Sequence, residues 1–158
     1  MKSQIEQLAA ALVQRNWTLV TAESCTGGGV AWSLTELTGS SAWFEGGFVT
    51  YSNAMKQRAL GVKASLLEAQ GAVSQGCVEA MAAGALANSS AQLSVSVSGI
   101  AGPGGGTREK PVGTVWIAWA RCDGVCASNC FSFNGDRQSV RDQAVAEAIA
   151  GLLALIAI

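Results

Sequence analysis

The sequence predicts an α/β fold, in which the strands of one sheet alternate with helices along the chain. Residues 18–37 contain a short apolar strand, a polar turn and a helix, and residues 44–60 repeat that order. Apolar residues make up 49% of the chain and charged residues 13%, a balance that excludes disorder. With 158 residues, we expect one compact domain over 1–158 that is long enough to bury a core.

Charge and composition exclude several classes of function. The chain has 10 basic and 11 acidic residues without a long basic cluster, which disfavours nucleic-acid and anionic-membrane partners. It has no histidine, which excludes a Ser-His-Asp triad and any histidine-ligated metal. Its five cysteines form no Cys-x-x-Cys pair, so we expect reduced, mostly buried thiols and no metal. The charged, amphipathic first residues are unlike a signal peptide, which predicts a cytoplasmic location.

The first strand, turn and helix give the first candidate site. Helical spacing of apolar residues predicts a helix over 3–15, followed by a strand over 18–22. The turn at 24–28 then leads into a helix through Val30, Leu34 and Leu37. Glycines at the start of such a helix can form an anion site, but Ser24 or Thr26 can equally serve as a simple helix cap. Both interpretations stay open on the sequence alone.

The most polar stretch surrounds the second predicted strand, residues 44–52. A turn containing Ser41 precedes this aromatic and β-branched strand. Asn53 follows it as a candidate cap for a helix that carries Lys56. Candidate chemical groups therefore lie at both ends of one strand.

The second half of the chain continues the alternation. Helices are expected over 62–70 and 74–87, the second capped by Ser74, before a strand over 93–97. The glycine-rich residues 98–107 follow that strand directly. This position favours a ligand-binding loop over a flexible crossover.

The last elements are a hairpin and a long helix. Strands over 112–120 and 125–133 are joined through Asp123-Gly124. Asp136 is the expected cap of the C-terminal helix. Arg137 and Arg141 stand one turn apart at its start, either as a solvated face or as a phosphate-binding pair.

Six segments, taken together, closely resemble the C-terminal domain of the competence/damage-inducible CinA proteins. They are AESCTGG at 22–28, GSSAWFEGGFVTYSNAMK at 39–56, GAVS at 71–74, SGIAGPGGG at 98–106, KPVGTVW at 110–116 and GDR at 135–137. The resemblance implies a three-layer α/β/α sandwich with a mixed sheet of about five strands. Two-domain members carry a further domain similar to molybdopterin-binding proteins, which has no counterpart in these 158 residues.

The resemblance also implies an activity. Stand-alone members of the family hydrolyse the carboxamide of nicotinamide mononucleotide to nicotinate mononucleotide and ammonia, through a serine and a lysine and without a metal or cofactor. It implies catalytic roles for Ser41, Lys56, Ser24 and Tyr51. Substrate contacts are implied for Thr26, Gly27, Asn53, Ser98, Gly99, Ala101, Gly102 and Arg137, with Ser98, Arg137 and the glycine loop holding ribose and phosphate. Lys56 acts as a base only if its pKa falls from about 10.4 towards 7 or 8.

The identity of the nucleophile has two candidates. The resemblance favours Ser41, but a straight strand over 44–52 would span nearly 30 Å at about 3.3 Å per residue and separate Ser41 from Lys56. A bulge at Gly46-Gly47, or a folded-back loop, would bring them together. Ser24 is the alternative, because parallel first and second strands would place it near Tyr51 and Lys56.

Two further expectations concern function and assembly. The competing function is a catalytically inactive nucleotide-binding adaptor linked to competence or DNA-damage responses, although the candidate catalytic residues are all present. The apolar tail GLLALIAI and the low charged fraction predict a homodimer or a larger assembly.

Overall fold

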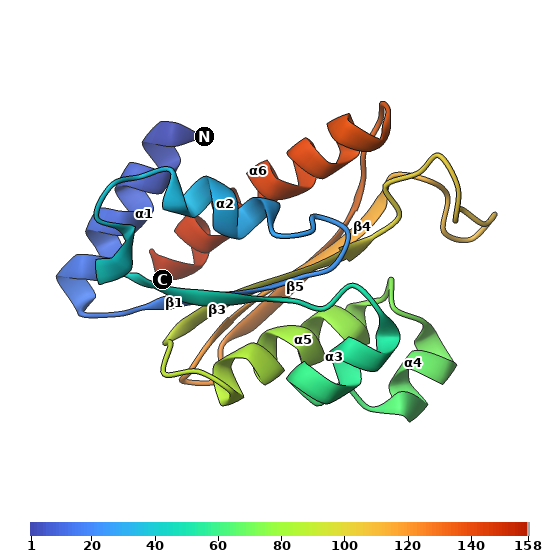
Figure 1. The fold of residues 1–158 in the computed structure, drawn as a ribbon, viewed down its shortest axis with the longest axis horizontal. Helices are drawn as coiled ribbons and strands as arrows, with labels where there is room; N and C mark the ends of the chain where they lie inside the picture. Colours follow the sequence, from blue (N-terminus) through green and yellow to red (C-terminus); the bar gives the residue numbers. More distant parts are fainter. Residues whose placement is uncertain (158) are drawn as a thin grey trace.

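The computed structural model describes residues 1–157 and contains one mixed sheet of five strands in the order β2-β1-β3-β4-β5 (Figure 1). β1 is parallel to both β2 and β3, while β4 is antiparallel to β3 and β5. The strands are β1 (Leu19–Glu23), β2 (Phe44–Val49), β3 (Leu93–Gly99), β4 (Thr114–Arg121) and β5 (Cys126–Ser132).

Helices cover both faces of this sheet (Figure 1). On one face lie α1 (Lys2–Arg15), α2 (Gly29–Thr35) and α6 (Arg137–Ile156), and on the other α3 (Asn53–Leu60), α4 (Ala64–Gln70) and α5 (Gln75–Ala87). The predicted three-layer α/β/α sandwich is therefore confirmed. Within residues 1–157, no helix has the length and apolar character needed to cross a membrane.

Residues 151–157 of the apolar C-terminal tail pack into the core of their own chain, and Ile158 lies outside the described residues. Leu152, Leu155 and Ile156 are buried in the same cluster as Leu8 and Leu12 of α1. The tail thus packs the terminal helix against α1 and the sheet, and it does not form the exposed apolar surface from which we predicted a subunit contact.

The small residues of α5 allow the close packing that the sequence predicts. A Cβ atom built on Gly84 would lie 2.0 Å from the carbonyl oxygen of Leu60, at the end of α3. No side chain fits there without moving that backbone. The close approach fixes the position of α3, which carries Lys56.

The caps of α5 and α6 follow the sequence, and the cap of α3 does not. Ser74 and Asp136 cap α5 and α6 as predicted, accepting hydrogen bonds from the N–H groups of Cys77 (3.2 Å) and Ser139 (2.9 Å). At α3 the cap is Ser52, whose hydroxyl accepts from the N–H of Met55 at 3.1 Å, and not Asn53. The difference arises because β2 ends at Val49 instead of residue 52, so α3 begins one residue earlier than a cap at Asn53 requires.

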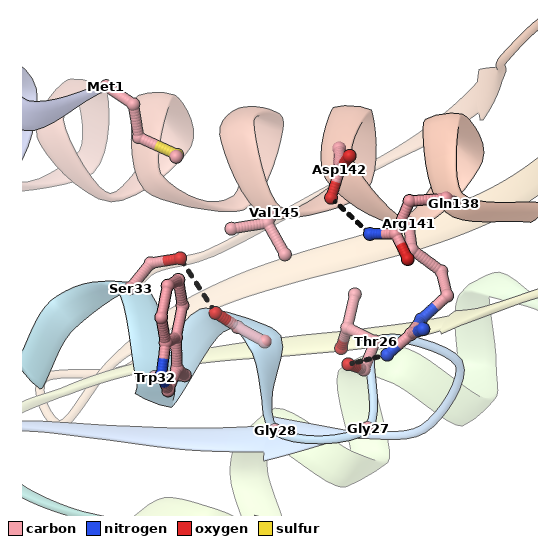
Figure 2. A pocket seen from close by; sticks show the side chains of 11 residues that line it. Met1, Thr26, Gly27, Gly28, Trp32, Ser33, Gln138, Arg141, Asp142 and Val145 are labelled. Carbon is pink, nitrogen blue, oxygen red and sulfur yellow. Dashed lines mark hydrogen bonds between the residues drawn. The ribbon is translucent and has the colours of Figure 1, made fainter. Parts of the chain in front are cut away.

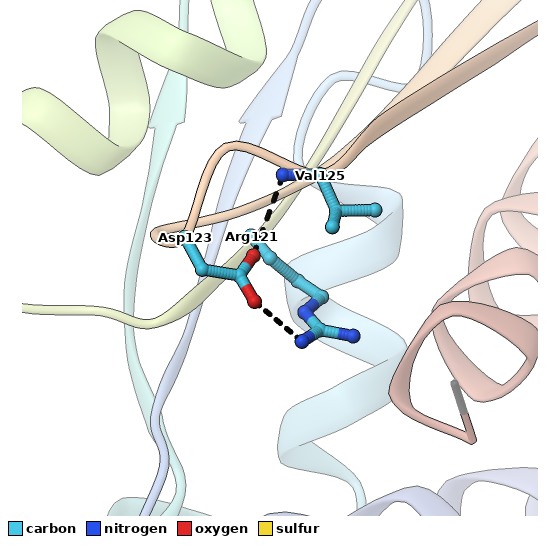
Figure 3. Close-up of polar contacts among 3 residues, drawn as sticks. All are labelled: Arg121, Asp123 and Val125. Carbon is cyan, nitrogen blue, oxygen red and sulfur yellow. Dashed lines mark hydrogen bonds and ion pairs between the residues drawn. The ribbon is translucent and has the colours of Figure 1, made fainter.

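The β4–β5 hairpin turns at Asp123-Gly124, as predicted. Gly124 has a φ of 94°, a left-handed conformation that favours glycine. The Asp123 carboxylate accepts a hydrogen bond from the N–H of Val125 at 3.3 Å and pairs with the Arg121 guanidinium (Figure 3). This hydrogen bond from Arg121 lowers the pKa of the Asp123 carboxyl.

The expectation that most cysteines are buried is wrong for three of the five. Cys25 and Cys77 are buried, but Cys122, Cys126 and Cys130 are exposed. The last three belong to the hairpin turn and to β5, which is the edge strand of the sheet. Their spacing does not reveal how little of that edge the helices cover.

Candidate active site

The parallel strands bring several polar residues to one edge of the sheet. Glu23, the last residue of β1, is aligned with Val49 of β2 and Val97 of β3. Ser24 comes next and donates its backbone N–H to the carbonyl of Val97 at 2.9 Å. Thr50 and Ser98 follow Val49 and Val97 directly. Ser24 therefore lies between the ends of two neighbouring strands, where open α/β sheets bind ligands.

Lys56 reaches this edge from α3. Its Nζ donates hydrogen bonds to Ser24 Oγ (2.9 Å), the carbonyl of Thr50 (2.8 Å) and the carbonyl of Tyr51 (3.2 Å). Helical side chains tilt towards the amino end of their helix, which directs Lys56 back to the β2–α3 connection. The side chain is only 1% exposed. Ser24, Tyr51 and Lys56 thus meet, as the sequence predicts for this group.

The surroundings of Lys56 favour a neutral amine. Burial lowers the pKa of Lys56. Within residues 1–157 the only ion pair is that of Arg121 and Asp123, so no carboxylate within 4.0 Å balances the ammonium. Burial raises the pKa of the neighbouring Cys25 thiol to about 11 and also raises that of Cys77, so both remain uncharged at neutral pH.

The hydrogen-bond partners of Lys56 suit a general base. Carbonyl oxygens can only accept, so the carbonyls of Thr50 and Tyr51 hold two N–H groups of the lysine in either protonation state. A neutral amine then directs its lone pair at the remaining partner, the hydroxyl of Ser24. This geometry allows the Ser24 proton to pass to Lys56 Nζ.

The sequence analysis missed Glu23, which is 1% exposed and organises the turn after Ser24. Its Oε1 accepts hydrogen bonds from Thr26 Oγ1 (2.7 Å) and the N–H of Val30 (2.9 Å). Its Oε2 accepts from the N–H of Ala31 (3.0 Å). The carboxylate therefore caps α2 from the end of β1. A cap seven residues before its N–H partner has no local sequence signature, unlike the Ser and Asp caps.

The hydrogen bonds of Glu23 occupy N–H groups at the start of α2 that could otherwise bind an anion. Neither Ser24 nor Thr26 caps α2 with its side chain: Glu23 accepts from the N–H groups of Val30 and Ala31, and the backbone carbonyl of Thr26 accepts from that of Gly29 at 3.0 Å. An anion at residues 24–28 cannot use them either. Thr26 was predicted to touch substrate, yet its buried hydroxyl is committed to Glu23.

We predict that Glu23→Gln lowers turnover by about tenfold or more. A carboxamide has only one acceptor oxygen, so the glutamine side chain cannot replace both carboxylate oxygens and loses one hydrogen bond to the helix. The measurement is the rate of ammonia release per folded molecule, with folding followed by circular dichroism. Glu45→Gln is the matched control, since Glu45 also accepts from a backbone N–H, that of Ser90, but is the second residue of β2, at the end of that strand away from Lys56. Equal rates for wild type and Glu23→Gln would contradict the positioning role.

Arg137 joins the glycine-rich loop to the β2–α3 connection. Its Nη1 donates to the carbonyl of Gly102 at 2.8 Å and its Nη2 to the Tyr51 hydroxyl at 2.9 Å. Gly102 has a φ of 80°, and a Cβ there would lie 2.4 Å from Val112 Cγ1. Arg137 therefore links Gly102, one of the loop residues predicted to touch substrate, to Tyr51.

The structure does not bring Ser41 to Lys56. Ser41 is exposed in the short 3-10 helix Ser40–Ala42 before β2, whereas Lys56 follows β2. The sheet register does shift between Phe44 and Gly46, near the predicted bulge, but the strand continues to Val49. Its six residues separate the two groups by about 20 Å along the strand. Within one chain Ser41 therefore does not contact Lys56, and its role as nucleophile stays a prediction. The proposal below uses Ser24, which does contact Lys56.

Asn53 is also outside the cluster. It is the first residue of α3, and its exposed side chain makes no hydrogen bond within residues 1–157. Its predicted substrate contact remains a prediction.

A pocket of about 450 Å³ lies between α2 and α6, beside the turn that follows Ser24 (Figure 2). The backbone of Gly27, Gly28 and Gly29 forms one wall, and Arg141 of α6 reaches across to the carbonyl of Thr26 at 3.2 Å. Trp32, 65% exposed, stands at the rim. The predicted contact residue Gly27 thus lines this pocket.

Fold and site together define an α/β protein with a buried serine–lysine pair at the carboxyl edge of its parallel strands. The family model described as the CinA C-terminal domain matches residues 1–156, and the chain belongs to this family. The resemblance found in the sequence is thereby confirmed.

Several relatives of known name and structure are similar over most of the chain. A nicotinamide-nucleotide amidohydrolase PncC from Pseudomonas putida is 57% identical over 89% of this chain and 87% of its own length. The protein of the same name from Escherichia coli K12 is 55% identical over 91% of this chain and 87% of its own length. The crystal structure of the competence damage-inducible protein A from Klebsiella pneumoniae superimposes with a TM-score of 0.94 at 40% identity, covering 98% of this chain and 96% of that one.

Proposed function

We propose that this protein is a nicotinamide-nucleotide amidohydrolase, which converts nicotinamide mononucleotide and water to nicotinate mononucleotide and ammonia. The observation that carries the proposal is the 2.9 Å contact between the buried Lys56 Nζ and Ser24 Oγ. The relatives named as nicotinamide-nucleotide amidohydrolases supply the substrate. A place in pyridine nucleotide recycling and a cytoplasmic location follow as part of the same proposal.

The first half of the reaction forms an ester on Ser24. Neutral Lys56 takes the hydroxyl proton while Ser24 Oγ attacks the carboxamide carbon, so that a C–O bond forms and the carbonyl becomes an oxyanion. The Lys56 ammonium then protonates the amide nitrogen. The C–N bond breaks, ammonia leaves, and the nicotinoyl group remains on Ser24 with Lys56 neutral again.

The second half reverses the same proton path with water. Lys56 takes a proton from a water molecule, whose oxygen attacks the ester carbon, and returns it to Ser24 Oγ as the ester bond breaks. The N–H of Thr26, two residues after the nucleophile, makes no hydrogen bond within residues 1–157 and is our candidate donor to the oxyanion.

Tyr51 provides a surface for the substrate ring. Its carbonyl accepts from Lys56, its hydroxyl accepts from Arg137, and its side chain is 58% exposed. The pyridinium of nicotinamide mononucleotide carries a positive charge, which an aromatic face attracts. Ser98, Gly99 and Ala101, at the end of β3 and in the loop beyond it, complete the proposed substrate wall.

The test of this function is ammonia release from nicotinamide mononucleotide by the purified protein, with Lys56→Met as the blank. We expect turnover by the wild type and none by the variant. No release by well-folded wild type would favour the adaptor function instead.

The expected pH dependence of activity and stability follows from the direction in which burial shifts the pKa of Lys56. Burial lowers the pKa of Lys56 in the folded protein, so the neutral, reactive amine becomes populated at a pH below the usual lysine range. We expect kcat to rise with pH through that lowered pKa and then level off. The free energy of unfolding should also increase as the pH rises from the lowered pKa of Lys56 in the folded protein to its ordinary pKa in the unfolded chain. Over that range the unfolded chain still binds the proton and the folded protein does not. Rate profiles and urea unfolding from pH 6 to 10 check both slopes.

We also propose a homodimer. The buried C-terminal tail is not evidence for a dimer, but the apolar side chains of Trp32, Val49 and Met55 are exposed around the site and could form an interface. Light scattering at micromolar concentration is expected to give at least twice the chain mass of 16.1 kDa. A monomer mass would contradict the assembly without affecting the proposed chemistry.

A further inference from the structure

We propose that Arg141, at the pocket between α2 and α6, binds the phosphate group of the nucleotide substrate. This inference rests on the proposed function. The helical spacing offered Arg137 and Arg141 as a phosphate-binding pair and the resemblance favoured Arg137, whereas the structure points to Arg141. It makes Arg141 the residue that distinguishes a nucleotide from its nucleoside.

The charge of Arg141 is not balanced inside the protein. The side chain is half-buried, its Nη2 donates to the Thr26 carbonyl at 3.2 Å, and its Nε is buried without a partner. No carboxylate lies within 4.0 Å of it among residues 1–157. The adjacent Asp142 accepts a hydrogen bond from Gln138 instead (Figure 2). A partly buried guanidinium with unused donors suits an anion, and phosphate matches its geometry.

The opposite wall of the pocket leaves room for that anion. Gly27 and Gly28 have φ values of 59° and 97°, and a Cβ on Gly27 would lie 3.5 Å from Arg141 Nη2. A side chain at Gly27 would therefore occupy space beside the guanidinium. The first N–H groups of α2 are bonded to the Thr26 carbonyl and to Glu23, so an anion here depends on a cationic side chain, which Arg141 provides. Met1 and Asp142 also line the pocket, and the Asp142 carboxylate accepts from Gln138.

The pocket also lies close enough to Ser24 for the phosphate end of a bound substrate to enter it. The N–H of Gly27 donates to the carbonyl of Ser24 at 2.9 Å, which puts the pocket wall one tight turn from the proposed nucleophile. In nicotinamide mononucleotide the pyridinium ring and the ribose separate the carboxamide from the phosphate. A substrate with its carboxamide at Ser24 can therefore extend its phosphate past the turn to Arg141.

Arg137 is the less suitable partner. Each of its terminal nitrogens already donates one N–H group, one to the Gly102 carbonyl and one to the Tyr51 hydroxyl, whereas Arg141 makes a single hydrogen bond among the described residues. It holds the wall of the site in place, so its loss should affect every substrate alike.

The experiment compares nicotinamide mononucleotide with nicotinamide riboside, which lacks the phosphate. For Arg141→Gln we expect kcat/KM to fall by about 10- to 150-fold for the nucleotide, the range for a hydrogen bond to a charged group, and to change less than threefold for the riboside. Arg137→Gln should lower both by a similar factor. Arg15→Gln, on α1 beside Trp17, is the matched control and should change neither.

A second measurement does not depend on turnover. Inorganic phosphate should raise the melting temperature of the wild type and of Arg15→Gln, and should not raise that of Arg141→Gln. Arg141→Lys, which keeps the charge, covers the case in which the glutamine variant fails to fold and should retain part of the nucleotide preference.

The outcomes separate this inference from the proposed function. Equal losses for both substrates in Arg141→Gln, or a collapse of the nucleotide preference in Arg137→Gln alone, would overturn the assignment to Arg141. A wild type that releases no ammonia from nicotinamide mononucleotide would instead overturn the proposed function, and the melting experiment would then decide the phosphate site by itself.

Discussion

Lys56→Met is expected to reduce ammonia release from nicotinamide mononucleotide to the level of a protein-free blank. Methionine fills the buried space of the lysine stem but has no group that can take the Ser24 proton. Both halves of the reaction need that transfer, so the loss should appear in kcat. Substrate binding, followed by calorimetry, should change little, because Lys56 contacts Ser24 and two carbonyls and not the phosphate pocket.

Lys56→Arg is the informative companion variant. Arginine retains the positive charge and can donate to the carbonyls of Thr50 and Tyr51, but it does not lose its proton near neutral pH. It should be almost as inactive as Lys56→Met. Substantial turnover by Lys56→Arg would mean that this position acts through its charge and not as a base.

Ser24→Ala is expected to abolish turnover, whereas Ser41→Ala should stay within about twofold of wild type, the small change expected for an exposed residue away from the site. Ser24 Oγ is the only hydroxyl that contacts Lys56 Nζ within residues 1–157. Ser41 is exposed at the other end of β2, which makes it a natural control of the same residue type. Initial rates of ammonia release measure both. If Ser41→Ala releases no ammonia above the blank while Ser24→Ala retains measurable turnover, Ser41 and not Ser24 is the nucleophile.

Much of the fold could be predicted from local sequence patterns. Alternating strands and helices, the Asp123-Gly124 turn and the caps Ser74 and Asp136 depend on neighbouring residues, and each is present in the structure. The end of β2 was less predictable. Residues 50–52 have strand propensity, yet after Val49 the chain turns into α3 and presents two carbonyls to Lys56.

The candidate site was predicted in part, for a physical reason. Ser24, Tyr51 and Lys56 were expected together because parallel strands share a carboxyl edge. The same argument separated Ser41 from Lys56, and the structure agrees with that strand length. Which of the two serines is the nucleophile stays a prediction. Glu23 escaped notice because its partner Val30 is seven residues away and leaves no spacing pattern in the sequence. Arg141 was expected only as one of a pair with Arg137, because its contact with Thr26 is made across the fold.

The most direct test of the central claim, that Ser24 attacks the carboxamide with Lys56 as its base, is to trap the ester. Wild-type protein turning over nicotinamide mononucleotide is quenched in acid, digested and examined by mass spectrometry. The adduct carries the whole nucleotide, so its mass is distinctive even at low occupancy. We predict it on the peptide that contains Ser24 and expect none in Lys56→Met. An adduct on the peptide that contains Ser41 would contradict the account.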